Sequence, residues 1–468
     1  MATAVFRKAH PRKVARWLQD RVRHALEAGT LEVRRRQMQV YDRLHRRPPL
    51  PPGSLSARCL RDAVTDDRHY LREFRRHGPI FKLLWGSGRV KICILGFERA
   101  RHLFGQHREV LRLENTQSIE RLVPAEYLRS MSPAIHPHYR HVFLEAFRSD
   151  LVAASEDTLR ATMTRCLADV AQPPGDGPGA AQRLYEALNT IATRSLLRTM
   201  LGVDPATPDA AALQDLYRRL GPRGHVERAG AAHEAIFRAI HDIVAALRHS
   251  LADASATTVG DSVLRRLQAS TPAAVDETVV GNLIYMVERG RHDLRDLLRW
   301  IVKYLSDHPA TVAAIRTELA GPPGTSRLAE ACVLETLRLD QSEHLNRRVL
   351  RSFEFEGFHF PQDAWVSIMT RESHRDPRAF TDPDAFRPER FLGRRPTADE
   401  YSPFGIGEHQ CIGSALTVRV CTLFIEELVS RYTWTVAADG PRRFGLHWEP
   451  SPQFAIDLVP AKPGIARS

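Results

Sequence analysis

The chain has 468 residues, of which 43% are hydrophobic, so it can bury a large core within a single domain. It contains no apolar run long enough to span a membrane and no apolar stretch typical of a signal peptide, and we expect a cytoplasmic protein. Six scattered cysteines lack the close pairing that disulfide frameworks and zinc sites require.

The net charge of +12 is unevenly distributed along the chain. Residues 1–48 contain thirteen Arg and Lys but only four Asp and Glu. We therefore predict a basic N-terminal extension over residues 1–50, solvated and helical, with an acidic protein as the alternative partner. Nucleic-acid binding is not predicted, because the segment has no recognisable motif for it and few aromatic residues. The cations are nearly all arginine, which is typical of a GC-rich bacterial genome.

Helical periodicity dominates the chain after a proline-rich linker at residues 47–53. Alternating apolar residues at 81–95 first predict a β-hairpin with its turn at Gly86-Ser87-Gly88. Apolar residues at three- and four-residue spacing then predict helices, separated by breakers such as residues 173–177, over 141–170, 180–202, 209–221, 228–252, 276–307, 309–320 and 326–340.

Alternation returns near residues 348–370, where four phenylalanines flank Gly357 and predict a small sheet. A final helix is expected just after Cys411. The predicted fold is mostly α with a minor β region, and residues 51–468 are expected to form one domain.

Cys411 has a context that the other cysteines lack. It ends the glycine-rich segment SPFGIGEHQC, residues 402–411, and precedes a predicted helix. Glycines let the backbone approach a flat cofactor and direct N–H groups at the sulfur, while a helix N-terminus favours the thiolate that a metal needs. A buried cysteine in a turn fits these features equally well.

The segment FGIGEHQCIG resembles the haem-binding loop of the cytochrome P450 family, Phe-x-x-Gly-x-(Arg/His)-x-Cys-x-Gly. The resemblance implies that Cys411 ligates the iron of haem b (iron protoporphyrin IX). It also implies cofactor-binding positions at Phe404, Gly407, His409 and Gly413, with His409 as a donor to a haem propionate.

Further family motifs occur in the expected order. Glu335-Thr336-Leu337-Arg338 resembles the family's Glu-x-x-Arg, and Arg390 in FRPERF resembles the residue that completes an ion-paired structural triad with Glu335 and Arg338. The resemblance covers residues from about 60 to about 460 and implies the P450 fold.

Three more residues match family positions that bind the haem propionates. His136 and Arg140 match His-x-x-x-Arg, and Arg348 matches the arginine that follows the triad helix. The resemblance assigns cationic or hydrogen-bonding side chains here because two buried carboxylates are costly without them.

The sequence departs from the family in the long helix expected above the haem, residues 276–307. The family usually has (Ala/Gly)-Gly-x-(Asp/Glu)-Thr, whose acid and alcohol supply protons for oxygen activation. Here the motif is Arg289-Gly290-Arg291-His292-Asp293. Asp293 replaces the alcohol, His292 the acid and Arg289 a small residue.

Arg289 and Asp293 are four residues apart and are expected to share a haem-facing side of the helix with Asp296, beside His292. One interpretation is an intrahelical ion pair that fills a pocket. The other gives catalytic roles to Asp293, His292 and Arg289, because charges in the middle of a buried helix are costly unless they serve a site.

Three functions follow from this departure. The leading hypothesis is a monooxygenase of a small organic substrate in bacterial secondary metabolism, with Asp293 relaying protons and an acidic ferredoxin-type protein as electron donor. The second is a peroxide-driven peroxygenase, in which Arg289 or Arg291 holds an anionic substrate, although the family's fatty-acid peroxygenases have Arg-Pro here and this chain has no proline at this place. The third is a non-oxidative haem enzyme or a catalytically degenerate P450 partner protein.

Overall fold

The computed structural model describes residues 33, 36, 40, 48–85, 89–113, 127–172, 179–221, 231–252, 261–270, 275–322, 325–340, 344–445 and 447–461. Most of the expected basic extension, the expected turn at 86–88 and the breaker at 173–177 lie outside these residues. The chain divides into two compact units, residues 1–113 with 344–373, and residues 114–343 with 374–468.

The first unit is built on a six-stranded mixed sheet in the order β1-β2-β3-β8-β5-β4. The expected hairpin is present as β2 (Ile80–Leu84) and β3 (Val90–Ile94), with Ile80 opposite Ile94. All residues of β2, β3 and β8 (Trp365–Ile368) are buried, so both faces of the central sheet are covered. The edge strands are β1 (Gly53–Ser54) and β4 (Leu111–Arg112), and β5 (Leu345–Val349) lies between β8 and β4.

Several helices and a small hairpin accompany this sheet in the described part of the first unit. The helices are α2 (Ala57–Thr65), α3 (His69–His77), α4 (Phe97–Gln106) and α14 (Thr370–Ser373). The hairpin pairs β6 (Phe353–Phe355) with β7 (Phe358–Phe360), as the alternating phenylalanines predicted.

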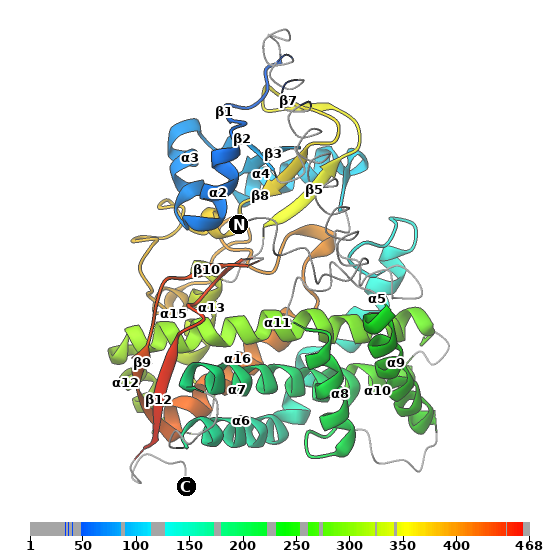
Figure 1. Ribbon diagram of the computed structural model, residues 1–468, viewed down its shortest axis with the longest axis vertical. Helices are drawn as coiled ribbons and strands as arrows, with labels where there is room; N and C mark the ends of the chain where they lie inside the picture. The colour runs from blue at the N-terminus through cyan, green and yellow to red at the C-terminus, as the bar shows by residue number, and fades with distance from the viewer. Residues whose placement is uncertain are drawn as a thin grey trace, which may run out of the picture. The chain divides into compact units, whose positions relative to one another are not determined.

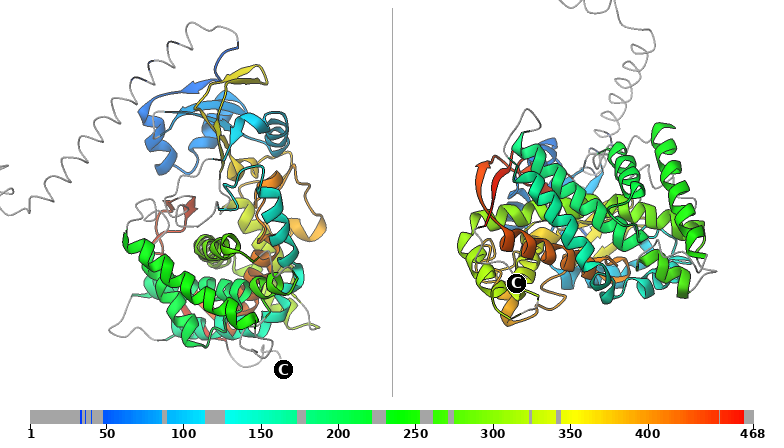
Figure 2. Two further views of the ribbon diagram at one scale, coloured as in Figure 1. Left: turned by 90° about the vertical axis from the view of Figure 1, so that its right-hand side faces the viewer. Right: turned by 90° about the horizontal axis from the view of Figure 1, so that it is seen from below.

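The second unit is a helical assembly around α11 (Glu277–Asp307), which crosses it in Figure 1 and is seen nearly end-on in Figure 2, left. Helices that pack against α11 include α7 (Ala180–Leu196), α9 (Ala231–Ala252), α13 (Arg327–Leu339) and α16 (Ser414–Arg431). The other helices are α5 (His136–Ala146), α6 (Glu156–Val170), α8 (Pro208–Arg219), α10 (Val263–Ser270), α12 (Pro309–Leu319) and α15 (Arg390–Gly393). Two antiparallel strand pairs join them: β9 (Tyr432–Ala438) with β12 (Ala455–Pro460), and β10 (Arg443–Phe444) with β11 (Trp448–Glu449).

The limits of α11 follow from its sequence. The Asp276 side chain caps the N-terminus by accepting a hydrogen bond from the Val279 backbone N–H. The helix ends before Pro309, because a proline disfavours helical backbone in the residue before it. Between them, Gly290 permits close contact with α7, since a Cβ at this position would lie 3.0 Å from Leu196 Cδ1.

The predicted helix at 141–170 differs from the structure. Helix α5 ends at Ala146, and two 3₁₀ turns, Ser149–Leu151 and Ala153–Ser155, precede α6. Leu151 and Val152 are buried in this connection, so the apolar spacing continues across the break and no glycine or proline marks it. The mostly α fold with a minor β region is confirmed. Within the described part of the chain, no helix combines the length and apolar character needed to cross a membrane.

Candidate active site

Cys411 lies between a glycine-rich loop and the start of α16. Gly405 and Gly407 have φ of 89° and 68°, a left-handed conformation that side chains disfavour. This conformation lets the loop fold back, so that the Cys411 backbone N–H donates to the Phe404 carbonyl oxygen at 2.9 Å. The Gly413 backbone N–H in turn donates to the Cys411 sulfur.

The environment of the Cys411 thiol fits a metal ligand. Desolvation by the surrounding protein raises its pKa and the charge of Asp293 adds to this, while the Gly413 hydrogen bond and Arg140 oppose it. Cys411 nevertheless has exposed surface. A thiol that is surrounded by protein on most sides but accessible on one has both a raised pKa and exposed surface. An iron ion bound on the accessible side would deprotonate it. These residues therefore fit a haem whose iron is ligated by Cys411.

Helix α5 brings two of the expected propionate partners to the Cys411 loop. His136 is buried and its ring centroid lies 4.6 Å from that of His409. Arg140 donates from Nη1 to the Gln410 carbonyl oxygen at 3.0 Å. Burial lowers the pKa of Arg140, and the anionic forms of Cys411 and Glu408 counteract this. The three side chains thus form a cationic and hydrogen-bonding group of the kind that carboxylates require.

Arg348, the remaining predicted propionate partner, belongs to the first unit. It lies on β5, and its guanidinium pairs with Asp363 at 2.5 Å, with both side chains partly exposed. Successive side chains of a strand point to opposite faces, so Arg347 is turned inward instead. Arg347 is buried, and its guanidinium lies 4.9 Å from the centre of the Phe104 ring. The alternation of β5 distinguishes the two arginines, which the sequence motif alone did not.

Glu335, Arg338 and Arg390 meet in the second unit. Arg338 donates to both Glu335 carboxylate oxygens at 2.7 and 2.8 Å, and Arg390 Nε donates to Oε1 at 3.1 Å. Glu335 and Arg338 are fully buried. Arg338 also donates to the carbonyl oxygens of His374, Pro383 and Ala385, so it joins Glu335 to the segment that precedes the Cys411 loop.

The middle of α11 presents one open face. From Thr278 to Val302, every residue is buried except Arg289, Gly290 and Asp293. Residues 289 and 293 are one helical turn apart and share a face. Because the charge of Asp293 acts on the pKa of the Cys411 thiol, this face is within electrostatic range of the sulfur. Asp293 and Cys411 are thus close enough within the second unit for the charge of one to affect the other.

His292 does not lie on this open face but is buried in a chain of charged groups. Its Nδ1 is 3.1 Å from Arg295 Nη1, and its Nε2 is 3.2 Å from a carboxylate oxygen of Glu288. Arginine can only donate, so Nδ1 accepts and the proton lies on Nε2, which donates to Glu288. Glu288 also receives Arg291 Nε at 2.7 Å.

These contacts bear on the predicted role of His292 as a proton-supplying residue. Desolvation and the charge of Arg291 lower the pKa of His292 to about 4, although Glu288 opposes the shift. At neutral pH the imidazole is therefore uncharged and engaged at both nitrogens. Asp296, expected on the same face as Asp293, is likewise buried and is held by Arg295 at 2.8 and 2.9 Å.

Comparisons with known proteins agree with this geometry. The family model described as Cytochrome P450 matches residues 218–455. Abscisic acid 8'-hydroxylase 1 of Oryza sativa subsp. japonica is 22% identical over 415 residues, 83% of this chain and 86% of that protein. Cytochrome P450 26A1 of Gallus gallus is 23% identical over 432 residues, 84% and 86% of the two chains.

Solved structures share the fold. Retinoic acid bound cyanobacterial CYP120A1 superimposes with a TM-score of 0.69 at 18% identity, covering 88% of this chain and 99% of the other. Cytochrome P450 CYP102L1 gives a TM-score of 0.68 at 17% identity, with coverage of 88% and 99%.

The chain belongs to the cytochrome P450 family. It is therefore, in general class, a haem-thiolate monooxygenase with the P450 fold. A bound haem would supply the iron at which oxygen is activated, and Cys411 is the residue whose thiolate would hold that iron and donate electron density to it.

Replacing Glu335 by Gln should destabilise the second unit strongly. The change leaves Arg338 and Arg390 without their buried counter-ion, and breaking such a pair costs about 3–5 kcal/mol. Urea unfolding followed by far-UV circular dichroism measures the loss. Glu389→Gln, at an exposed carboxylate near Arg390, is the matched control and should change stability by less than about 0.5 kcal/mol. Equal stability of the two variants would contradict this role of Glu335.

His292 should make the protein acid-sensitive. Its native pKa is about 4, below the usual 6.5, so the unfolded chain binds the proton first as pH falls and native stability is lost progressively below pH 6.5. Between about pH 7 and about pH 5 the loss from this residue is about 2 kcal/mol. His292→Gln keeps one donor and one acceptor but cannot titrate, and should lose correspondingly less stability.

Urea unfolding at both pH values checks this difference, with the exposed His138→Gln as control. An acid-induced loss in His292→Gln as large as in the wild type would rule out His292 as its source.

Proposed function

We propose that this protein is a monooxygenase of a small organic substrate in which the Asp293 carboxylate moves the protons that oxygen activation requires. The observation that carries the proposal is the open face of α11. Arg289, Gly290 and Asp293 are the incompletely buried residues between Thr278 and Val302, and the Asp293 charge reaches the Cys411 thiol.

The neighbours of Asp293 support it as the proton-moving group. His292 is neutral and bonded at both nitrogens, and the carboxylates of Glu288 and Asp296 are each held by an arginine. Asp293 is the half-buried carboxylate in the middle of this helix. A carboxylate oxygen can accept a proton and give it up again. Asp293 could therefore move protons at the position where the family usually has a threonine hydroxyl.

A second candidate, peroxide-driven oxygenation of an anionic substrate, is supported by Arg289. This guanidinium shares the open face with Asp293, and a charge-assisted bond from arginine suits a carboxylate. The names of two similar proteins mention a carboxylic acid: abscisic acid for the hydroxylase of Oryza sativa, and retinoic acid for the cyanobacterial structure. We propose that the substrate is apolar with one carboxylate, whichever oxidant is used.

The remaining proposals concern the cellular setting. Arginine-rich composition supports a bacterial origin and a tailoring step in secondary metabolism, in the cytoplasm. An acidic ferredoxin-type protein would be the electron donor, and the basic extension at residues 1–50 would bind an acidic protein. For Arg348 we propose the propionate-binding role that the resemblance implies, with Arg347 as the alternative because it is the more deeply buried of the two arginines.

Replacing Asp293 by Asn should abolish the rapid reaction with hydrogen peroxide. Asparagine keeps the shape but cannot exchange the proton, and general acid–base catalysis contributes about 10²–10⁴ in rate. Stopped-flow absorption at the Soret band of the ferric protein measures this. Asp307→Asn, at the exposed end of the same helix, is the matched control.

A peroxy acid serves as the second oxidant, because its carboxylate leaving group needs no proton, and both variants should react with it at wild-type rate. Slow, identical bleaching of wild type and Asp293→Asn by hydrogen peroxide would exclude peroxide as oxidant. Unequal rates with the peroxy acid would instead mean that the substitution disturbs the haem.

Replacing Arg289 by Gln should weaken binding of an acid but not of its ester. Loss of one charge-assisted bond costs about 1.5–3 kcal/mol, so the Kd for retinoic acid should rise about tenfold or more. The Kd for its methyl ester should stay unchanged. Isothermal titration calorimetry with both compounds checks this, with the exposed Arg218→Gln as control. Tighter wild-type binding of the ester than of the acid would refute an anionic substrate.

A further inference from the structure

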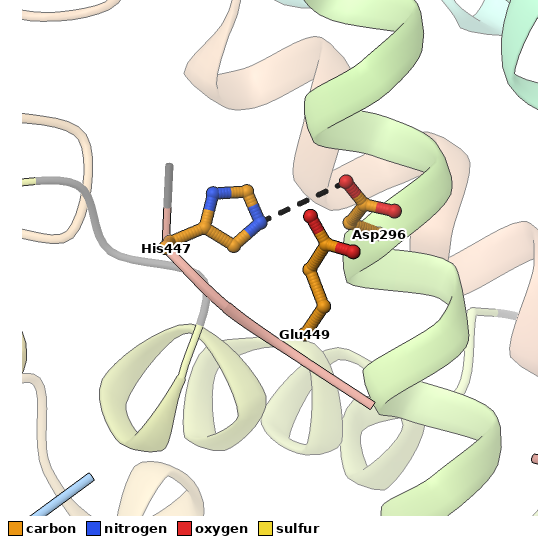
Figure 3. A group of neighbouring side chains, drawn as sticks. All are labelled: Asp296, His447 and Glu449. Atoms are coloured by element: carbon orange, nitrogen blue, oxygen red, sulfur yellow. Dashed lines mark ion pairs between the residues drawn. The ribbon is translucent and has the colours of Figure 1, made fainter. Parts of the chain in front are cut away.

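A buried cluster of charged side chains joins α11 to strand β11. His447 and Glu449 are directed toward Asp296, and the ligand atoms of the three residues all lie within 4.8 Å of one another (Figure 3). Arg295 donates to both oxygens of Asp296, and Arg443 donates to Glu449 at 2.8 Å. Because both carboxylates already have arginine counter-ions, this cluster fastens β11 to the helix without needing a metal ion.

The strand held in this way also orients Trp300, which follows Asp296 by about one helical turn. Trp300 is buried, and its Nε1 donates to the Trp448 carbonyl oxygen of β11 at 2.9 Å. It comes seven residues after Asp293, which is two helical turns, so both residues belong to one side of α11 and are about 10 Å apart along its axis. An easily oxidised indole ring is therefore fixed on the same side of the helix as the open face.

Tyr304 extends this aromatic row by a further helical turn. Its ring is stacked on that of Trp300, with centroids 5.6 Å apart and an angle of 28° between the planes. The other side of the Tyr304 ring is stacked on Phe386, at 4.8 Å and 6°. The phenol ring thus lies between two other aromatic rings, in direct contact with the indole and with both faces covered.

The Tyr304 hydroxyl has a proton acceptor at short range. Its Oη donates to Asp340 Oδ2 at 2.5 Å, and Asp340 is fully buried. Burial and the charge of Asp340 raise the pKa of Tyr304, so the phenol keeps its proton in the resting protein. A phenol that loses an electron becomes a strong acid. Asp340 is then in place to receive the proton.

Arg442 distinguishes the two oxidisable rings. Its guanidinium lies 4.8 Å from the centre of the Trp300 ring and disfavours a positive charge on the indole. Trp300 Nε1 faces a backbone carbonyl oxygen, which is not a base, whereas Tyr304 can pass its proton to a carboxylate and stay uncharged. Arg442 Nη1 lies 3.4 and 3.5 Å from the two Asp340 oxygens. These contacts make Trp300 a relay and Tyr304 the end point for the loss of an electron.

We propose that Tyr304 is a redox-active residue, which gives an electron through Trp300 to a one-electron oxidant formed at the haem and gives its hydroxyl proton to Asp340. The Oη–H bond breaks and an O–H bond forms on Asp340, so a neutral tyrosyl radical lies beside a carboxylic acid. Reduction by one electron reverses the step, and the proton returns. An oxidising equivalent that meets no substrate is thereby moved away from Cys411. The proposal rests on the haem-thiolate class and not on the role proposed for Asp293.

Electron paramagnetic resonance of the haem-loaded ferric protein tests this role. The protein is mixed with 3-chloroperoxybenzoic acid without substrate, because this oxidant needs no proton from Asp293. Samples are frozen during the reaction, and the Soret band is followed in parallel. We expect an organic radical whose signal narrows when the protein contains ring-deuterated tyrosine. Deuterated tyrosine does not change the signal of a tryptophan radical, so narrowing assigns the radical to tyrosine.

Three variants locate the radical. Tyr304→Phe keeps the stacked ring but lacks the hydroxyl, so it should lose the tyrosyl signal and its haem should bleach faster than in the wild type. The matched control is Tyr217→Phe, which should keep the wild-type signal. Tyr217 is buried, but its hydroxyl donates at 3.0 Å to the Ile284 carbonyl oxygen, which cannot take the proton. Asp340→Asn keeps Tyr304 but removes the base, so its tyrosyl signal should be weaker. This last variant also tests the proposal if Tyr304→Phe does not fold.

Three results would overturn the role of Tyr304. They are the absence of an organic radical in the wild type, a wild-type tyrosyl signal in Tyr304→Phe, and an undiminished tyrosyl signal in Asp340→Asn. A Soret band that changes without any radical counts against Tyr304 alone. The comparison of Asp293→Asn with the wild type in hydrogen peroxide is a separate measurement, so the two proposals can fail independently.

Discussion

The position of the thiolate loop depends on the ion pairs that the fully buried Glu335 carboxylate forms with Arg338 and Arg390. A buried anion needs its counter-ions, so α13 cannot separate from the segment that carries Arg390 without leaving charges uncompensated. The same segment is fastened further along, where Tyr401 Oη donates to the Leu334 carbonyl oxygen at 2.8 Å and the Ser402 N–H donates to His374 Nε2 at 3.0 Å. Cys411 follows directly, and its place beside α5 and opposite α11 is thus set by an ion pair that takes no part in the chemistry.

Helix α11 also contains buried charges that need counter-ions, and it supplies many of them from its own residues. It carries five charged residues between 288 and 299 that are buried, and each of them is held by an oppositely charged or hydrogen-bonding neighbour: Glu288, Arg291, Arg295, Asp296 and Arg299. Arg289 and Asp293 are partly accessible, and the proposed chemistry of the helix is concentrated on them. The cost of burying charge thus separates a structural side of the helix from a side that can face a substrate.

Much of this arrangement could be predicted from sequence, because it depends on local patterns. The glycine loop around Cys411, the Glu335 and Arg338 spacing, and the limits of α11 are each encoded within a few residues. The break between α5 and α6 could not be predicted, because buried Leu151 and Val152 maintain helical spacing through it. The choice between Arg347 and Arg348 depends on which face of β5 is covered, and Asp363 pairs with the exposed one.

The sequence by itself determined the family, predicted Cys411 as the thiolate ligand and revealed the unusual residues of the distal motif, because short motifs carry chemistry that few alternatives can satisfy. Only the tertiary structure decided the surroundings of those residues. His292 and Asp293 are adjacent in sequence and equally able to titrate, yet packing buries one between Glu288 and Arg295 and leaves the other on an open face. The physical reason is that protonation depends on desolvation and on nearby charges, and both are supplied by residues that meet only when the chain is folded.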